Sequence, residues 1–177
     1  MVKKRIFIYM SRHVNKCLKE QHIKLDDVSA VEALEMEGDL ADVFDLENQF
    51  FHVQLHPEAK KYFSFAVEKE DGEMQYYQYK VMGYGFAPAV SAVTRLIKPV
   101  MVYLHKLDIR GSIYVDDGKC RDQSKEGAEV AMELMLQVIQ LAGWNIQWAK
   151  TTTQVEQRVQ YLGLIPDTKE MEFRVEE

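Results

Sequence analysis

Apolar and polar positions along the chain repeat with two periods, one of three to four residues and one of two residues. The longer period is typical of amphipathic helices and the shorter of half-buried strands. The longer period predicts helices over 27–37, 88–104 and 124–141. We expect Pro99 to kink the second of these helices, because its ring interrupts the backbone hydrogen bonds.

The third helix has clear signals at both ends. Ser124 is suited to its N-terminus, where a side-chain oxygen can accept from a backbone N–H group. Gly143 is suited to end it, because glycine readily adopts the left-handed conformation found there. The residues that we expect to form its apolar face are Val130, Leu134, Val138 and Leu141.

Strands are predicted where apolar residues alternate, or run continuously, between turn signals. These strands are 4–9, the start of 42–55 before a helical continuation, 62–68, 73–81, 111–118, 144–149, 158–165 and 171–175. A hairpin turn is expected over 70–72, and another turn over 166–169. Helices that alternate with antiparallel hairpins predict an α+β fold, with helices packed on one face of a mainly antiparallel sheet. The other face would be free to carry a site.

Composition sets bounds on the class of protein. The 177 residues, 47% of them hydrophobic, suffice for one compact domain with a core. No run approaches the roughly 18 apolar residues of a membrane span, and we expect neither a cleaved signal peptide nor a membrane partner. Cys17 and Cys120 make neither a disulfide framework nor a zinc motif. We therefore expect an intracellular protein of the cytoplasm or nucleus.

The charge of the chain narrows the functional classes. A net charge of −6 and a pI of about 5.4 argue against a protein that holds nucleic acid over its whole surface. The same acidity is compatible with a carboxylate-rich metal site. Charge therefore favours catalysis over passive nucleic-acid binding.

The most suggestive chemistry lies at 112–118, where an apolar strand runs into Asp116, Asp117 and Gly118. Adjacent carboxylates repel each other, and a divalent cation would remove that conflict. The pattern therefore indicates a strand that presents carboxylates to Mg²⁺. Asp-Gly after an apolar run is also a common hairpin signal. On these residues alone, both interpretations stay open.

A second acid occupies a similar position. Asp45 ends the apolar run Val43-Phe44 and precedes Asp116 by 71 residues. Two such strands side by side would bring both carboxylates to one place. The alternative is that Asp45 caps a helix that begins after it.

Six segments, in this order, resemble the motifs of reverse transcriptases, the RNA-directed DNA polymerases. They are a fingers motif ending in Asn-Lys (12–16), the first catalytic motif (44–53), a glycine-to-proline motif (83–88), the Tyr-Val-Asp-Asp box (114–117), a motif ending in lysine (141–150) and a primer-grip hairpin (161–163). The residues at 96–99 and 162–167 are most similar to the DIRS group of retrotransposons.

The resemblance implies a reverse transcriptase palm, an antiparallel sheet with helices packed on one face, plus a stub of fingers. The whole chain, 1–177, would be one domain with a fingers remnant (1–40), a palm (41–157) and a primer-grip hairpin (158–177). Thumb and ribonuclease H modules would be absent. The implied partners are dNTPs and an RNA or DNA template with its primer, with further polyprotein domains or other chains as additional candidates.

The resemblance also implies two Mg²⁺ ions, with Mn²⁺ as an alternative. Asp45 and Asp116 would be the main metal ligands, Asp117 a supporting acid, and the backbone carbonyl of Leu46 a further ligand. Lys150 would protonate or electrostatically support the leaving pyrophosphate. The alternative for Lys150 is an ordinary surface lysine.

Nucleotide and primer contacts are implied as well. Phe50 would exclude a 2′-hydroxyl group and so select dNTPs, with a plain core aromatic as the alternative. Gly83, the backbone up to Pro88 and Arg12 would contact the incoming nucleotide. The residues that would position the primer end are Tyr114, Tyr161, Leu162 and Gly163.

Several positions depart from the family pattern. They are Met10 in place of an aspartate, Ile6 beside Arg5 in place of the triphosphate-binding arginine, and Val81 and Met82 before the third motif. A catalytically inactive or repurposed palm that acts as a scaffold therefore remains an alternative, as does, more remotely, an unrelated two-metal nucleotidyltransferase. His52 and His56 lack a third metal ligand nearby, and Trp144 and Trp148 are expected in the core.

Overall fold

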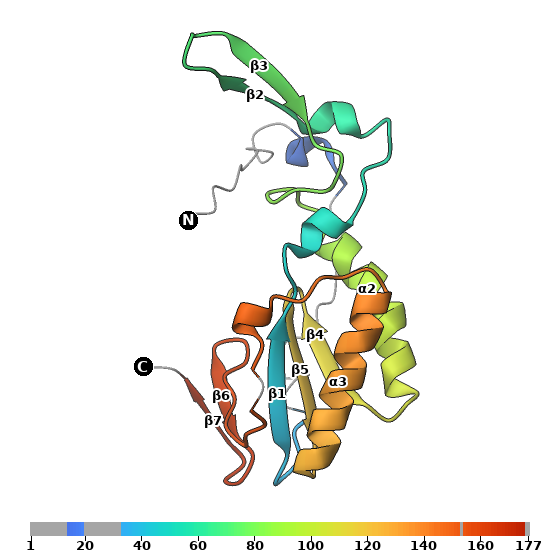
Figure 1. Ribbon diagram of the computed structural model, residues 1–177, viewed down its shortest axis with the longest axis vertical. Coiled ribbons are helices and arrows are strands. Elements are labelled where there is room, and N and C mark those ends of the chain that lie inside the picture. The colour runs from blue at the N-terminus through green and yellow to red at the C-terminus, as the bar shows by residue number, and fades with distance from the viewer. Residues whose placement is uncertain (1–13, 20–32, 153, 176–177) are drawn as a thin grey trace. The chain divides into compact units, whose positions relative to one another are not determined.

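The computed structural model of the chain describes residues 14–19, 33–152 and 154–175 (Figure 1). Two compact units are formed, one from Met1–Ile23 and Phe50–Val93, the other from Lys24–Gln49 and Thr94–Glu177. The strand predicted over 4–9 lies outside the described residues. In their described part, the residues of both units combine helices with antiparallel strands, so the predicted α+β class is confirmed.

The smaller unit carries a hairpin of β2 (Ser64–Glu68) and β3 (Met74–Gln78), in the register Phe65↔Tyr77. Gly72 has a φ of 82° at its tip, as the predicted Glu-Asp-Gly turn requires. Three 3₁₀ helices also occur in the first part of the described chain: η2 (Asn15–Cys17), η3 (Gln49–His52) and η4 (Lys60–Phe63).

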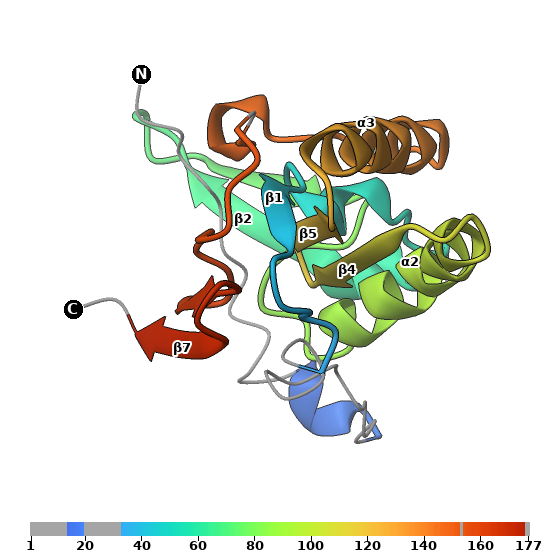
Figure 2. The same cartoon turned by 90° about the horizontal axis from the view of Figure 1, so that it is seen from below.

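The larger unit is built on a three-stranded antiparallel sheet in the order β1-β5-β4. Its strands are β1 (Leu40–Asp45), β4 (Arg110–Tyr114) and β5 (Asp117–Asp122). A separate hairpin joins β6 (Leu164–Asp167) to β7 (Glu172–Val175). Figure 2 shows the helix α3 (Lys125–Leu141) on one side of the sheet and the β6–β7 hairpin on the other.

The predicted ends of α3 are confirmed, but its predicted apolar face is wrong. Ser124 accepts from the backbone N–H of Gly127 over 3.0 Å, and Gly143 has a φ of 93° just beyond the helix. The buried residues are Ala128, Met132, Met135, Leu136 and Ile139, whereas Leu141 is 88% exposed. Two apolar stripes run along this helix, and the sheet selects the stripe whose Met135 fits over the bare backbone of Gly111.

The helix α2 (Ala89–His105) begins directly after Pro88, as expected, and continues through Pro99. The helix predicted over 27–37 lies largely outside the described residues, and its described end, from residue 33, is not helical. The carboxylate of Asp39 accepts the N–H of Met36 there over 2.9 Å, and Gly38 donates to Thr168. These backbone groups are therefore not used for a helix.

Several predictions for the C-terminal part are also wrong. The strand predicted over 158–165 has only isolated bridges at Arg158 and Tyr161 before β6 begins at Leu164. The segment 144–149 is not a strand: it has a single bridge, Ile146↔Leu46, before the 3₁₀ helix η5 (Trp148–Lys150). Trp144 is buried as expected, but Trp148 is 58% exposed. The turn expected over 166–169 begins only at Thr168, because Pro166 is tolerated in the two-stranded β6–β7 hairpin, where a missing N–H is harmless.

The sheet face opposite α3 is not free, contrary to expectation. Lys119 and Arg121 of β5 are each 1% exposed there, and Glu35 forms a salt bridge to Lys119 over 2.6 Å. Tyr161 is also buried against this face, at 5.9 Å from the Lys119 ammonium. The candidate site therefore lies at the end of the sheet. No helix among the described residues is long and apolar enough to cross a membrane.

Candidate acidic site at the end of the sheet

Two strands bring their acidic residues together at one end of the sheet. Asp45, the last residue of β1, is paired with Asp117, the first residue of β5. The N–H of Leu46 donates to the carbonyl oxygen of Asp116 over 2.8 Å, which continues the contact beyond the strands. The side-by-side placement of the two strands is confirmed. The alternative of a helix cap at Asp45 is wrong, because the next helix begins only at Gln49.

A two-residue turn presents the paired acids. Tyr114 pairs with Asp117 across it, so the turn consists of Val115 and Asp116. Val115 has a φ of 59°, whereas Asp116 has no positive φ, which is the pattern of a type II′ hairpin. A β-branched residue at positive φ is strained. The hairpin interpretation and the acid-presenting interpretation of this segment are therefore compatible.

Gly118 was expected to form the turn, and this prediction is wrong, because the residue lies inside β5. A Cβ atom at Gly118 would lie 2.1 Å from Cζ of Phe44. The ring of Phe44 is itself 2% exposed, so it has little room to move away. Glycine is needed here because an aromatic ring crosses the strand at this point.

Lys150 reaches the acids from a third segment. The N–H of Gln147 donates to the carbonyl oxygen of Asp45 over 2.7 Å, which ties this segment to the end of β1. The ammonium Nζ of Lys150 then donates to Oδ2 of Asp45 over 2.7 Å. This hydrogen bond raises the pKa of Lys150. Because the Lys150 side chain is 64% exposed, the pair contributes little to stability.

The three carboxylates influence one another. Burial raises the pKa of Asp117, and the negative charges of Asp116 and Asp45 raise it further. The charge of Lys150 acts in the opposite direction. These four residues therefore form one electrostatic group, although they come from three segments of the chain.

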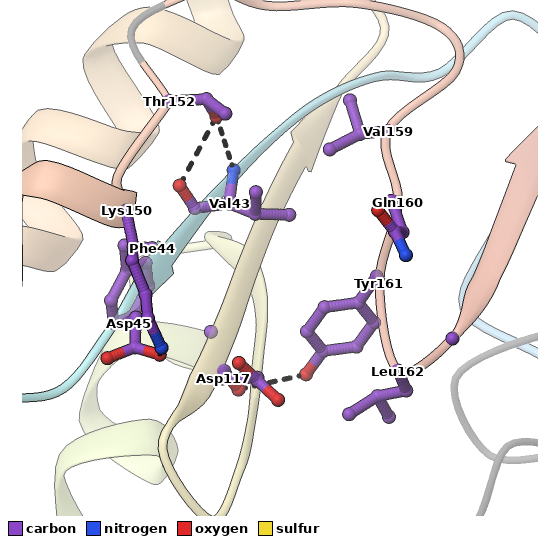
Figure 3. A pocket seen from close by; sticks show the side chains of 12 residues that line it. Val43, Phe44, Asp45, Asp117, Lys150, Thr152, Val159, Gln160, Tyr161 and Leu162 are labelled. Carbon is purple, nitrogen blue, oxygen red and sulfur yellow. Dashed lines mark hydrogen bonds and ion pairs between the residues drawn. The ribbon is translucent and has the colours of Figure 1, made fainter.

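A cavity of about 530 Å³ lies beside this group (Figure 3). Asp45 and Lys150 lie on one side of it, and Tyr161 and Leu162 lie on the other, with Asp117 between them. Its lining consists of Val43, Phe44, Asp45, Asp117, Gly118, Lys150, Thr152, Val159, Gln160, Tyr161, Leu162 and Gly163. Two of the predicted catalytic acids, the predicted catalytic lysine and the predicted primer-grip residues thus share one cavity.

The far wall is a second tight turn. Tyr161 and Leu164 exchange backbone hydrogen bonds of 2.8 and 3.0 Å. Between them Leu162 and Gly163 have φ values of 53° and 78°, the pattern of a type I′ hairpin. Tyr161 is 4% exposed, so this wall presents mainly backbone and Leu162 to the cavity. Tyr114 is half-buried and does not line the cavity.

One known family matches nearly the whole chain. A family model described as reverse transcriptase (RNA-dependent DNA polymerase) matches residues 3–165. The chain belongs to the reverse transcriptase family. This range contains all six segments whose order predicted the family, so that prediction is confirmed. None of the curated proteins compared with the chain matches it.

The residues predicted to contact the nucleotide belong mostly to the smaller unit. Phe50 is 7% exposed and packs edge to face against Tyr84, with ring centroids 5.1 Å apart. A Cβ atom at Gly83 would be 4.0 Å from the Tyr79 ring, in ordinary contact. Pro88 precedes α2. Arg12 lies outside the described residues.

Sequence reasoning named the fingers motif but missed the role of Asn15. Its side-chain amide donates to the carbonyl oxygen of Gly85 over 2.8 Å and accepts from the N–H of Ala87 over 3.0 Å. Asn15 therefore holds the glycine-to-proline loop. The signal was present, because Asn15 belongs to the Asn-Lys pair that ends the motif, but its partner Gly85 lies 70 residues away.

The acids of this chain suit a divalent cation in their chemistry. Among the residues that the structure describes, no three His, Cys, Asp or Glu side chains are placed to hold a metal ion together, and Asp45 is bound to Lys150. Carboxylate oxygens are nevertheless the ligands that Mg²⁺ prefers. The repulsion that raises the pKa of Asp117 is the kind that a cation relieves. The donors therefore fit the ion in their chemistry, but the described acids are not placed around one point and the ammonium group of Lys150 occupies Asp45.

Proposed function

We propose that this chain carries the nucleotidyl-transfer centre of an RNA-directed DNA polymerase, which adds dNTPs to the 3′-hydroxyl group of a primer on a template. One observation carries the proposal: Asp45 and the pair Asp116 and Asp117 meet at the end of one sheet, in a chain of the reverse transcriptase family. The family accounts for the reaction class, and the geometry of the acids supports their role in it.

The acids and the lysine divide the work in this proposal. Asp45 and Asp116, with Asp117 in support and the Leu46 carbonyl as a further donor, bind two Mg²⁺ ions. When bound, such ions lower the pKa of the attacking hydroxyl group and neutralise the triphosphate. Lys150, released from Asp45, donates a proton or a hydrogen bond to the leaving pyrophosphate. Beyond its hydrogen bond to Asp45, the charges of all three acids act on its ammonium group and raise its pKa, which supports this assignment.

The remaining assignments follow the family motifs. The turn at Leu162 and Gly163 holds the primer end, with Tyr114 nearby on β4. Phe50 selects dNTPs, while Gly83, Pro88 and Arg12 contact the nucleotide. The source is a retrotransposon, and the sequence at 162–167 favours the DIRS group. An RNA or DNA template with its primer is the partner.

Two observations favour a second candidate function, that of a scaffold without catalytic activity. The ammonium of Lys150 occupies Asp45, and the described acids do not converge on one point. A reverse transcriptase domain that has lost its metals and acts as a nucleic-acid or protein scaffold would keep this arrangement permanently. It would extend no primer at any protein concentration.

Primer extension separates the two functions. The full chain is assayed on RNA and DNA templates with Mg²⁺ or Mn²⁺, beside Asp116→Asn and the matched control Asp108→Asn. Asp108 is exposed beyond α2 and has a φ of 59°, which asparagine tolerates. We expect extension by the wild type and by Asp108→Asn, and none by Asp116→Asn. Extension that survives in Asp116→Asn, or is missing from the wild type, contradicts the proposal.

A further inference from the structure

The hydroxyl group of Tyr161 lies where the two strands of the acid-bearing hairpin meet. It donates to the carbonyl oxygen of Asp117 on β5 over 3.1 Å. On the β4 side it interacts with the side chain of Ser112 and the backbone of Tyr114. One hydroxyl group thus contacts both strands directly below the turn of Val115 and Asp116.

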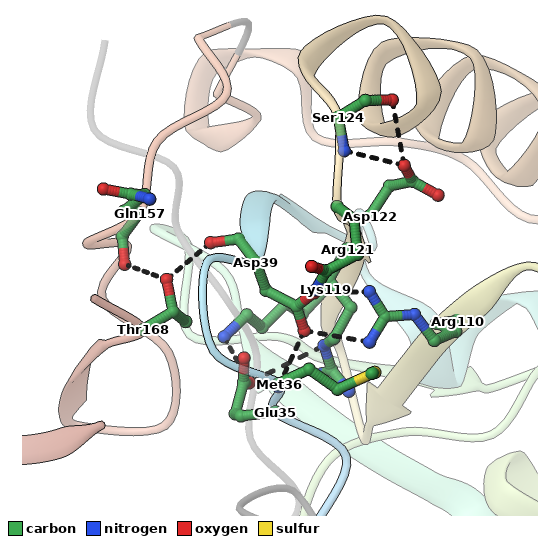
Figure 4. Close-up of polar contacts among 11 residues, drawn as sticks. Glu35, Met36, Asp39, Arg110, Lys119, Arg121, Asp122, Ser124, Gln157 and Thr168 are labelled. Atoms are coloured by element: carbon green, nitrogen blue, oxygen red, sulfur yellow. Dashed lines mark hydrogen bonds and ion pairs between the residues drawn. The ribbon is translucent and has the colours of Figure 1, made fainter. Parts of the chain in front are cut away.

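A buried polar network lies behind the hairpin, and Figure 4 shows its charged members Glu35, Lys119 and Arg121. Ser112 accepts from Nη2 of Arg121 over 3.1 Å, and Arg121 lies 3.6 Å from the carboxylate of Glu35. Glu35 also binds Lys119, whose ammonium lies over the Tyr161 ring. The contacts therefore form a continuous ring behind the hairpin that begins and ends at Tyr161. The side chains of Arg121, Lys119 and Glu35 in it are at most 1% exposed.

The hairpin needs such support because its turn is strained. Val115 at positive φ would relax if the neighbouring backbone were free to shift. The carbonyl group of Asp117 belongs to the peptide that follows the supporting acid, so its hydrogen bond to Tyr161 fixes the direction of that peptide. The hydroxyl group of Tyr161 is the donor in this hydrogen bond, and the backbone carbonyl can only accept.

We propose that Tyr161 is a positioning residue, which holds the carboxylates of Asp116 and Asp117 in place through the backbone of their hairpin. The proposal rests on the proposed function for its effect on turnover, but not for its effect on the hairpin. Tyr161 touches no reacting atom in this assignment. Its ring closes the cavity wall, and its hydroxyl group supplies the alignment, which in such sites tolerates errors of only about 0.5 Å.

The substitution Tyr161→Phe removes the hydroxyl group and keeps the ring. We expect kcat for single-nucleotide addition to fall about tenfold while KM for the dNTP stays within about twofold, because alignment is lost and binding is not. We also expect the amide protons at 114–118 to exchange with solvent about tenfold faster. Tyr103→Phe is the matched control, since Tyr103 is 53% exposed on α2.

The outcomes separate this proposal from the proposed function. Unchanged kcat in Tyr161→Phe, or exchange at 114–118 equal to that of Tyr103→Phe, overturns the positioning role. If the wild type extends no primer, the proposed function fails, and hydrogen exchange alone decides whether Tyr161 fixes the hairpin. If Tyr161→Phe does not fold, Ser112→Ala takes its place, because it removes the side-chain partner on β4, and the same readouts decide.

Discussion

Asp117 carries its carboxyl group into a half-buried position beside two other acids. Burial and the charges of Asp116 and Asp45 raise its pKa above the usual value of 3.8. In the unfolded chain these influences are absent, so the unfolded state loses the proton at lower pH than the folded state does. Stability contributed by the protonated group is therefore lost as the pH rises through the window just above 3.8.

This residue gives a prediction for stability. Asp117→Asn should raise the free energy of unfolding at pH 7 without divalent ions, by less than about 1 kcal/mol because solvent screens the group. Urea denaturation between about pH 3.5 and about pH 7 covers the titration of ordinary carboxyl groups. We expect the gain in unfolding free energy to grow with pH across this range. Asp108→Asn serves as the control. If Asp117→Asn were less stable than the wild type at pH 7, repulsion among the three carboxylates would not be destabilising the fold.

At the scale of elements, the β4–β5 hairpin depends on a contact with β1. Phe44 lies against the bare backbone of Gly118, in the strand pair that also aligns Asp45 with Asp117. Any side chain at Gly118 would push the two strands apart at the point where they present their acids. The steric fit and the placement of the acids are thus one structural feature.

Gly118→Ala tests this contact. We expect a loss of about 1–3 kcal/mol in the free energy of unfolding, because neither the strand nor the Phe44 ring has room to shift. Adding Phe44→Leu, which replaces the obstructing ring with a smaller side chain, should recover part of the loss. The double variant should therefore be more stable than the sum of the two single effects predicts. Chemical denaturation of the wild type, the two single variants and the double variant measures the single losses and the coupling between them. Additive losses would contradict the proposed fit.

The sequence predicted the hairpins and the ends of α3 because turn residues and caps act locally. It could not predict which stripe of α3 is buried, since Leu141 and Met135 are both apolar and only the sheet distinguishes them. It also misplaced the turn that carries the acids. Asp-Gly usually forms such turns, whereas the requirement for Gly118 comes from Phe44, which is remote in sequence.

At the scale of the whole molecule, the candidate site combines three remote segments. Asp45, the pair at 116–117 and Lys150 meet because 145–147 and β5 both pair with the end of β1. The order of motifs in the sequence was sufficient to name these residues and the family. It did not predict the ion pair between Lys150 and Asp45 or the buried network below Tyr161, because charged residues in a strand are usually exposed.

The central claim is that acids from two strands act as one divalent-cation site, from which Lys150 withdraws. Isothermal titration of the full chain with Mg²⁺ tests it most directly. We predict saturable binding by the wild type and by Asp108→Asn, and binding at least about tenfold weaker in Asp45→Asn and Asp116→Asn, since each loses a carboxylate ligand. Equal Mg²⁺ affinity in the wild type and in both of these variants would contradict the account.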